Sequence, residues 1–201
     1  MKQELKLFLK GILVMLLLAM KSLPCNAIGA YGAVDFNRLT NRNGLSNSQV
    51  NAIFKDQKGY VWFGTQSGLD RFDGFRIKAF LYDDGNPNSI PNNSVDEIQQ
   101  AIDGSLWIHT GVGYCIYQYD KERFDRKPEE WLKTIGVDGP PYKLLIDSKK
   151  NMWMSVYGQG IYFVDVKNMT AFLFPFSKTK SRSSLPDYQV SCIREDNGQA
   201  V

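Results

Sequence analysis

Short apolar runs alternate with turn-forming residues along most of the chain, beginning near residue 45. The first stretch has four runs rich in β-branched and aromatic residues, which are QVNAIFK (49–55), YVWFGT (60–65), LDRF (69–72) and FRIKAFLY (75–82). The gaps between them hold the turn sequences QKG, QSG and DG, in which glycine permits a positive φ. This pattern predicts four strands joined by tight turns. After residue 30 the sequence shows no convincing helical period, apart from a weak one over Pro128–Thr134.

The same pattern recurs at a fixed spacing. Three segments superimpose without gaps, with valine and isoleucine at the same places: LSNSQVNAI (45–53), IPNNSVDEI (90–98) and LPDYQVSCI (185–193). Three further phrases begin at Trp62, Trp107 and Trp153, which are 45 and 46 residues apart. Glycines complete the repeat signature, and these are Gly59, Gly68, Gly104, Gly113 and Gly160. Tryptophan, glycine and aromatic residues in phase over such a period are typical of four-stranded propeller blades.

The repeats predict an all-β fold, a β-propeller with about three four-stranded blades and the first strand of a fourth. The predicted boundaries are 45–89 for blade 1, 90–139 for blade 2, 140–184 for blade 3 and 185–201 for the beginning of blade 4. Counting from Val190, the fourth signature tryptophan would fall one position beyond Val201. We therefore expect an incomplete ring, in a chain that is either a fragment of a longer protein or a truncated gene product.

Residues 1–27 have the three parts of an export signal. A basic start precedes the apolar run GILVMLLLAM (11–20), and SLPCNA (22–27) ends on residues that fit cleavage after Ala27. The apolar run is shorter than the roughly 20 residues of a spanning helix, although an uncleaved membrane anchor beginning near Leu5 stays open. Pro24 before Cys25 disfavours a lipoprotein signal. Residues 28–44 form a lead-in to the first blade.

The formal net charge of +3 belongs to this N-terminal segment. Residues 1–27 hold four of the 24 basic residues and one of the 21 acidic residues, so the remaining residues carry no net charge. Contact with nucleic acid therefore has no electrostatic basis. Three cysteines are too few for a disulfide scaffold, and the single histidine, His109, argues against a histidine-rich metal site or a Ser-His-Asp triad. We expect no cofactor, no metal and no catalytic residues.

One segment identifies a family. The phrase DQKGYVWFGTQSGLDRFDG (56–74), preceded by NRNGLSNSQVNAI (41–53), closely resembles the two-component regulator propeller repeat. The resemblance covers the chain from about Phe36 to its end. The second repeat departs from the family at His109-Thr110-Gly111. The third departs at Ser155-Val156 and at Pro140-Pro141.

The resemblance implies the periplasmic sensor region of a hybrid two-component signalling protein. Such sensors bind oligosaccharides and regulate polysaccharide utilisation through kinase and DNA-binding parts that these residues do not encode. The partners implied are an oligosaccharide ligand and a second copy in a homodimer, with contact to the inner membrane only if residues 1–27 are retained. The alternatives are a fragment of an exported propeller-type carbohydrate-active enzyme and a non-functional truncated gene product.

Few residues qualify as ligand contacts. Trp62, Trp107 and Trp153 fit packing between blades better than sugar stacking, because they keep strict phase. Trp131 is out of phase in a charged stretch and is the better ligand candidate. His109 is a weaker one, with a hydrogen-bonded structural role as the alternative. Asp70 and Arg71 either face the ligand end of the blade or form a solvent-exposed pair.

Overall fold

The computed structural model describes residues 38–176, 190–196 and 199–200. The predicted signal or anchor at 1–27, most of the lead-in at 28–44 and the start of the predicted fourth blade lie outside these residues. Within the described part of the chain, no helix is long and apolar enough to cross a membrane. The last part of the lead-in forms a 3₁₀ turn, η1 (Asn41–Asn43), which the Thr40 side chain caps.

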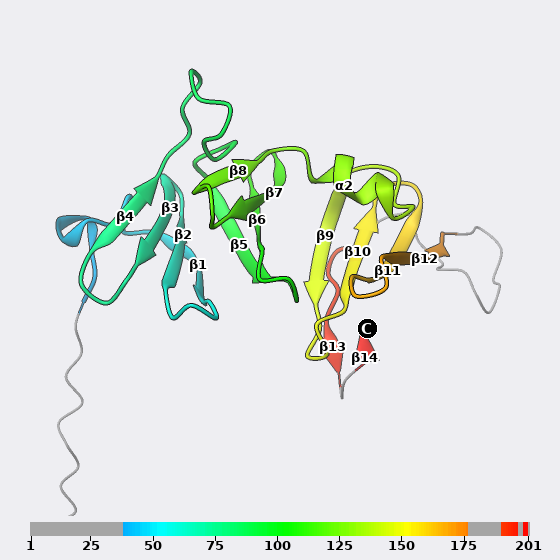
Figure 1. Cartoon of the computed structure of the whole chain (residues 1–201). Coiled ribbons are helices and arrows are strands. Elements are labelled where there is room, and N and C mark those ends of the chain that lie inside the picture. Colours follow the sequence, from blue (N-terminus) through cyan, green and yellow to red (C-terminus); the bar gives the residue numbers. More distant parts are fainter. Residues whose placement is uncertain (1–37, 177–189, 197–198, 201) are drawn as a thin grey trace, which may run out of the picture. The chain divides into compact units, whose positions relative to one another are not determined.

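Three four-stranded antiparallel sheets dominate the fold (Figure 1). In each sheet, strands that follow one another in sequence are hydrogen-bonded neighbours, which is the strand order of a propeller blade and confirms the predicted fold class. Among the described residues, no strand pairing closes the three sheets into a ring. Sheet 1 is β1 (Val50–Lys55), β2 (Val61–Thr65), β3 (Gly68–Phe72) and β4 (Ile77–Phe80). Sheet 2 is β5 (Val95–Gln100), β6 (Leu106–Thr110), β7 (Gly113–Gln118) and β8 (Arg123–Asp125). Sheet 3 is β9 (Pro141–Ile146), β10 (Met152–Val156), β11 (Gly160–Asp165) and β12 (Thr170–Pro175).

The outer strand of sheet 1 begins later than its sequence predicts. The run FRIKAFLY predicts a strand from Phe75, whereas β4 begins at Ile77. Asp73 is the cause, because its Oδ1 accepts hydrogen bonds from the backbone N–H groups of Phe75 and Arg76, at 2.8 and 2.7 Å. A side-chain turn of this kind occupies the two N–H donors in place of the strand ladder.

Sheets 1 and 2 approach closely at a glycine of the repeat. A Cβ at Gly64 on β2 would come within 2.7 Å of Val95 Cγ1 on β5, so only glycine permits this approach. In the next sheet, His109 has the phase of Gly64, and Pro141 on β9 has the phase of Val95. The contact between sheets 2 and 3 therefore cannot copy the contact between sheets 1 and 2.

Sheets 2 and 3 are instead linked through an amide side chain. Gln99 on β5 donates from Nε2 to the carbonyl oxygen of Leu144 at 2.8 Å, and its Oε1 accepts from the Ile146 N–H at 2.6 Å. The Gln99 side chain thus bonds one backbone carbonyl and one backbone N–H of β9, as a neighbouring strand would.

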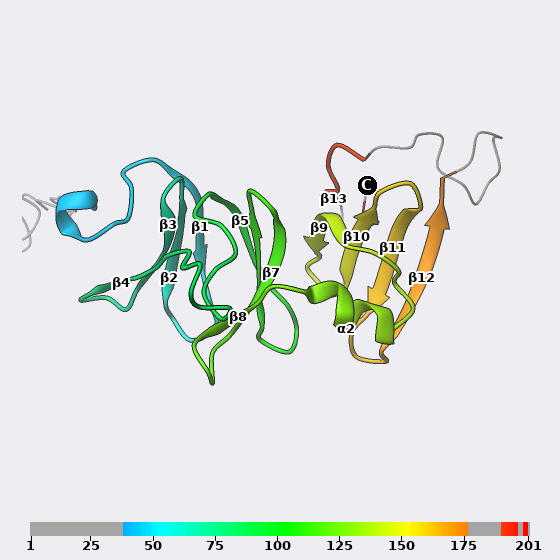
Figure 2. The same cartoon turned by 90° about the horizontal axis from the view of Figure 1, so that it is seen from above.

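Two hydrophobic clusters lie between successive sheets. The first joins Trp62 of sheet 1 to Tyr117 of sheet 2, among other buried residues. The second joins Trp107 of sheet 2 to Met152 of sheet 3 and includes Leu132 of the helix α2 (Pro128–Thr134). Figure 2 shows α2 beside the third sheet. The weak helical period over these residues thus marks a real helix, which proline begins and two glutamates in the first turn favour.

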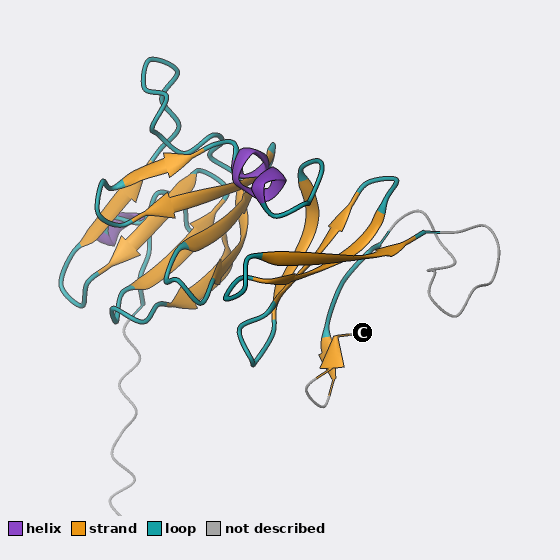
Figure 3. Ribbon diagram, turned by 45° about the vertical axis from the view of Figure 1, so that its right-hand side comes forward, coloured by secondary structure: helices purple, strands orange, loops and turns teal. Residues whose placement is uncertain are grey.

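The described part of the predicted fourth blade includes a short hairpin (Figure 3). The hairpin consists of β13 (Glu195–Asp196) and β14 (Gln199–Ala200). The sequence predicts the first strand of a fourth blade within 185–201, and of the described residues there Val190–Arg194 belong to no strand. In this hairpin Glu195 pairs with Ala200 and Asp196 with Gln199.

Candidate functional site

The junction between sheets 1 and 2 is filled around a buried carboxylate. Asp56 Oδ2 accepts hydrogen bonds from Trp62 Nε1 at 2.7 Å and from the Tyr119 hydroxyl at 2.6 Å, and Oδ1 accepts from the Tyr60 N–H at 2.9 Å. Trp62 is fully buried, and the Tyr119 ring meets it edge-on with centroids 6.2 Å apart. Burial also raises the pKa of the Tyr119 hydroxyl, with a further rise from Asp56. Together, Asp56, Trp62 and Tyr119 occupy the space at this junction.

The junction between sheets 2 and 3 keeps the tryptophan but loses its two partners. Trp107 has the phase of Trp62, while Ala101 stands at the phase of Asp56. Val166, directly after β11, has the phase of Tyr119, directly after β7. Two side chains at this junction are thus smaller than their equivalents at the first.

A cleft of about 250 Å³ lies at this second junction. Trp131 of α2 reaches its wall and meets Trp107 with ring centroids 6.0 Å apart at an interplanar angle of 62°. The apolar and aromatic lining is Ala101, Trp107, Ile116, Trp131, Met152 and Val166, and the polar lining is Asp103, Ser105, Gln118 and Asp125. Of the predicted ligand candidates, only Trp131 lies in this cleft, and its contact with a ligand stays a prediction.

The polar lining retains unused hydrogen-bonding atoms. Asp103 Oδ1 accepts from the N–H and hydroxyl of Ser105 at 3.0 and 2.7 Å, and Asp125 Oδ1 accepts from the Lys127 N–H at 3.0 Å. Gln118 Oε1 accepts from Arg123 Nε at 2.8 Å. Within the described residues, the second oxygen of each carboxylate and the amide nitrogen of Gln118 have no hydrogen-bond partner. The cleft thus offers two acceptors and one donor around an aromatic wall.

His109 has partners on its own sheet. Its Nδ1 lies 2.6 Å from Asp96 Oδ1, and its ring meets Tyr114 edge-on with centroids 4.6 Å apart. Tyr114 donates from its hydroxyl to Glu97 Oε2 at 2.8 Å. Among the described residues, no three metal-ligating side chains gather here or elsewhere. These contacts match the hydrogen-bonded structural alternative, and His109 does not line the cleft.

Asp70 fastens the segment just before β1 to the first sheet. It is fully buried on β3, and its two carboxylate oxygens accept hydrogen bonds from the Ser46 N–H at 2.8 Å and the Ser46 hydroxyl at 2.6 Å. Burial raises the pKa of this carboxyl, and the bonds from Ser46 oppose the rise. Asp70 is therefore not half of a solvent-exposed pair with Arg71.

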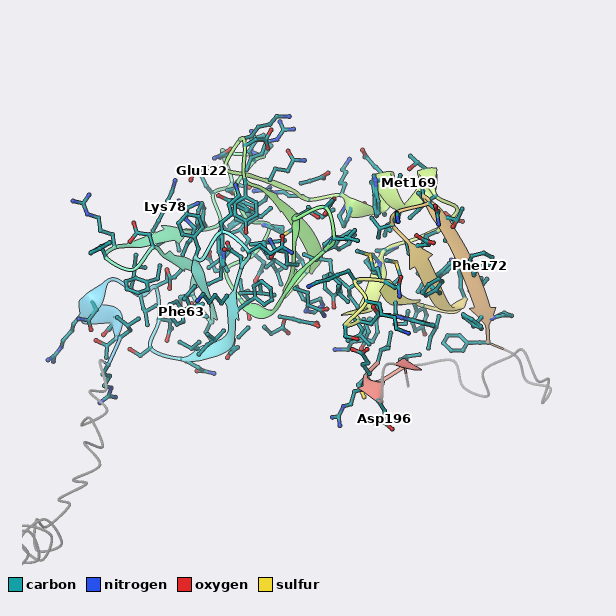
Figure 4. The ribbon with its side chains drawn as sticks, turned by 60° about the horizontal axis from the view of Figure 1, so that its bottom comes forward. Phe63, Lys78, Glu122, Met169, Phe172 and Asp196 are labelled. Carbon is teal, nitrogen blue, oxygen red and sulfur yellow. The ribbon has the colours of Figure 1, made fainter. Side chains whose placement is uncertain are left out.

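Arg71 connects sheets 1 and 2. Its guanidinium lies 4.7 Å above the Tyr60 ring, donates to the Tyr117 hydroxyl at 3.1 Å and pairs with Glu122 at 3.0 Å. Glu122 also binds Lys78, which is labelled beside it in Figure 4. Lys78 and Arg71 together lower the pKa of the Glu122 carboxyl. The charge of Arg71 is thus engaged between the two sheets.

The third signature tryptophan is less covered than the other two. Trp107 is 2% exposed, whereas Trp153 is only half-buried and packs against Phe163 and Phe174 of its own sheet. The outer strand β12 exposes Phe172, which Figure 4 labels and which is 60% exposed. This face of sheet 3 corresponds to the face that sheet 2 covers on sheet 1.

Residues 44–67 match the family described as the two component regulator propeller. This segment is thus similar to a two-component regulator propeller repeat. Histidine kinase P4 of Formosa agariphila is 32% identical to the chain over 138 residues, which are 64% of this chain. The same alignment spans 10% of that kinase, so the chain covers about a tenth of its length.

Extracellular domains of two hybrid two-component systems from B. thetaiotaomicron resemble this propeller chain in structure. The first has a TM-score of 0.60 at 25% identity, over 82% of this chain and 23% of that domain. The second has a TM-score of 0.53 at 16% identity, over 79% of this chain and 21% of that domain, and shows the fold alone. The three sheets thus resemble the propeller blades of extracellular domains of hybrid two-component systems.

Most residues of the cleft lack a signal of their own in the sequence. Asp103, Gln118 and Asp125 occur in turns or strand ends that look like ordinary surface. The signal that could have found the site is comparative, because alignment of the repeats puts Ala101 where Asp56 and Asp147 stand. A repeat that loses a buried partner while keeping its tryptophan marks the place where a cavity opens.

Proposed function

We propose that this chain is the N-terminal, ligand-binding propeller segment of a hybrid two-component sensor, that its ligand is an oligosaccharide, and that it works in the periplasm. The observation that carries the proposal is the cleft between sheets 2 and 3, which joins an aromatic wall to unpaired acceptors and a donor. Sugar rings present apolar C–H faces together with hydroxyl edges, and aromatic and polar side chains in one pocket match both. The propeller repeat and the related extracellular domains support the sensor setting.

Binding fits the cleft better than catalysis does. A glycosidase of the common type needs two carboxylates on opposite sides of the scissile bond, one of which acts as an acid. At the cleft, Asp103 is held by its own turn through Ser105, and Asp125 by Lys127. We therefore propose recognition without turnover, with export directed by residues 1–27.

In the proposed sensor, the free energy of ligand binding shifts an equilibrium between two arrangements of the protein. A ligand shifts such an equilibrium only as far as it prefers one arrangement. The cleft joins two sheets and the helix α2, so a bound sugar would favour the spacing of the sheets that suits it. We propose that this preference passes to a second copy in a homodimer and then to the kinase part of the sensor.

Replacing Trp131 by alanine is expected to weaken oligosaccharide binding at least about tenfold, because the half-buried aromatic wall of the cleft is lost. Neutral and acidic oligosaccharides on a glycan array, followed by titration calorimetry of the best ligand, measure the effect. Tyr157→Ala is the matched control, since Tyr157 is 78% exposed and does not line the cleft. Circular dichroism shows whether each variant retains its sheets.

Three outcomes would count against the proposal. Absence of binding to every oligosaccharide on the array would contradict oligosaccharide recognition. Release of new reducing ends or unsaturated products from the ligand would favour the exported enzyme. Equal loss in Trp131→Ala and Tyr157→Ala would show that the cleft is not where the ligand binds.

A further inference from the structure

One polar atom at the second junction lacks the partner that its equivalents have. Trp62 Nε1 donates to Asp56 at 2.7 Å, and Trp153 Nε1 donates to Asp147 at 3.1 Å. Trp107 is 2% exposed, and among the described residues its Nε1 has no hydrogen-bond partner. A buried donor left without an acceptor costs roughly 1–3 kcal/mol, so the pairing at the other two tryptophans is the expected state.

The missing acceptor is a consequence of the residue at position 101. The residue six positions before the tryptophan is aspartate in repeats 1 and 3 and alanine in repeat 2. Ala101 and Trp107 both line the cleft, so the carboxylate's place is open space. Among the described residues, Ser155 Oγ is the only fully buried side-chain nitrogen or oxygen atom that lacks a hydrogen-bond partner. Trp107 Nε1 also lacks a partner, so it is not fully buried and retains some contact with solvent.

We infer that the cleft binds one uncharged sugar residue and that the Trp107 indole N–H is the donor that recognises one of its oxygens. This inference rests on the proposed function and names the ligand class for its site. A ligand hydroxyl or ring oxygen takes the place that Asp56 Oδ2 holds at the first junction. The sugar ring occupies the space that the Tyr119 side chain fills there and that Val166 leaves open.

The lining sets the charge of the ligand. Asp103 and Asp125 each present a carboxylate oxygen to accept from hydroxyl groups, and Gln118 adds an amide. No lysine, arginine or histidine is among the described residues that line the cleft. A uronate or a sulfated sugar would bring its anion close to two carboxylates without a cation to pair with, which disfavours it.

The size of the cleft also limits the ligand. Its volume of about 250 Å³ is below the range of roughly 300–1,000 Å³ typical of pockets for drug-sized molecules. The cleft therefore holds a single residue of an oligosaccharide, and the rest of that chain extends into solvent. Its aromatic and apolar side chains on β6, β7, β10 and the helix α2 belong to or pack against the second hydrophobic cluster.

Rebuilding the first junction inside the second tests the inference. In Ala101→Asp, the new carboxylate accepts from Trp107 Nε1 and fills the donor's place. In Val166→Tyr, the ring fills the space without adding charge, and the double variant copies the set Asp56, Trp62 and Tyr119. We expect each single variant to bind neutral oligosaccharides at least about tenfold more weakly, and the double variant to show no measurable binding, while the melting temperature stays equal or rises.

The measurement is titration calorimetry with maltohexaose, cellohexaose, laminarihexaose, mannohexaose and hexagalacturonate. The wild-type chain is expected to bind at least one neutral hexaose and to bind hexagalacturonate at least about tenfold more weakly. Unchanged neutral binding in the double variant, with an intact melting transition, would overturn the cleft as the site. A preference for hexagalacturonate, or glycan binding that excludes all four neutral hexaoses, would overturn the ligand class and leave oligosaccharide sensing standing.

If Ala101→Asp lowers the melting temperature, Val166→Tyr still tests whether the cleft binds the sugar, because this substitution adds no buried charge.

Hydrogen exchange without ligand tests whether the Trp107 N–H is unpaired. The Trp107 indole N–H is expected to exchange with solvent at least about tenfold faster than that of Trp62, and Ala101→Asp is expected to slow it. Slow exchange at Trp107 in the wild-type chain would show that the donor is already paired and overturn the inference.

Discussion

Replacing Asp56 by alanine is expected to lower the free energy of unfolding by about 3–5 kcal/mol. The carboxylate accepts from Trp62 Nε1, the Tyr119 hydroxyl and the Tyr60 N–H, and it is 5% exposed. Its removal leaves the fully buried Trp62 N–H of sheet 1 and the half-buried Tyr119 hydroxyl of sheet 2 without their acceptor, and it opens a cavity between the sheets. Urea denaturation followed by tryptophan fluorescence measures the change.

Asp147→Ala is the matched control for this substitution. Asp147 has the same place in the third repeat and accepts from Asn151 and Trp153. Burial would raise the pKa of this carboxyl, but the hydrogen bonds from Asn151 and Trp153 outweigh burial and lower it. Trp153 is only half-buried, so water replaces the lost acceptor, and we expect a loss of about 1–2 kcal/mol. Equal losses in the two variants would contradict the role given to burial at the first junction.

Replacing Gly160 by alanine is expected to cost about 3 kcal/mol or more. Gly160 begins β11 with a φ of +152°, and an added Cβ would overlap the carbonyl oxygen of Phe174 on the paired strand β12. It would also come within 2.9 Å of Pro175 Cα. These neighbours are backbone atoms, so the outer strand has to move away to admit the methyl group. Thermal denaturation of the variant measures the loss.

Gly158→Ala separates the steric effect from backbone preference. Gly158 lies in the same turn with a φ of +73°, and a Cβ there meets no atom within 4 Å. Only the cost of a left-handed backbone applies, about 1 kcal/mol. A melting temperature that falls as far in Gly158→Ala as in Gly160→Ala would contradict the overlap with β12.

The strand order of the three sheets follows from the sequence because each blade is local. Every strand pairs with its neighbour in sequence, so periodic apolar runs and glycine turns suffice to predict it. Asp73 shortens β4 through a side-chain turn that strand propensity does not represent. The fourth repeat has the expected apolar residues at Val190 and Ile193, yet these lie outside any strand, because a strand needs a paired neighbour.

The candidate site is harder to predict from the sequence, because it arises where two side chains are smaller than their equivalents in the neighbouring repeat. Trp131 stands out in the sequence because it is out of phase with the repeat, which is a property of one residue. The cleft, however, comes from Ala101 and Val166 together, which lie 65 positions apart and become neighbours only when two blades stack. Asp70 shows the opposite case, since a charged residue on a strand looks solvent-facing until Ser46 of the preceding segment is placed against it.

The indole N–H spectrum of the four tryptophans tests the central claim most directly, because Trp62, Trp107, Trp131 and Trp153 each contribute one resonance. The measurement is the shift of these resonances when the neutral hexaose that binds tightest is added. We predict that the resonances of Trp107 and Trp131, which line the cleft, shift in proportion to occupancy while those of Trp62 and Trp153 stay in place. Shifts at Trp62 or Trp153 with Trp107 and Trp131 unmoved, or no shift at any tryptophan, would contradict it.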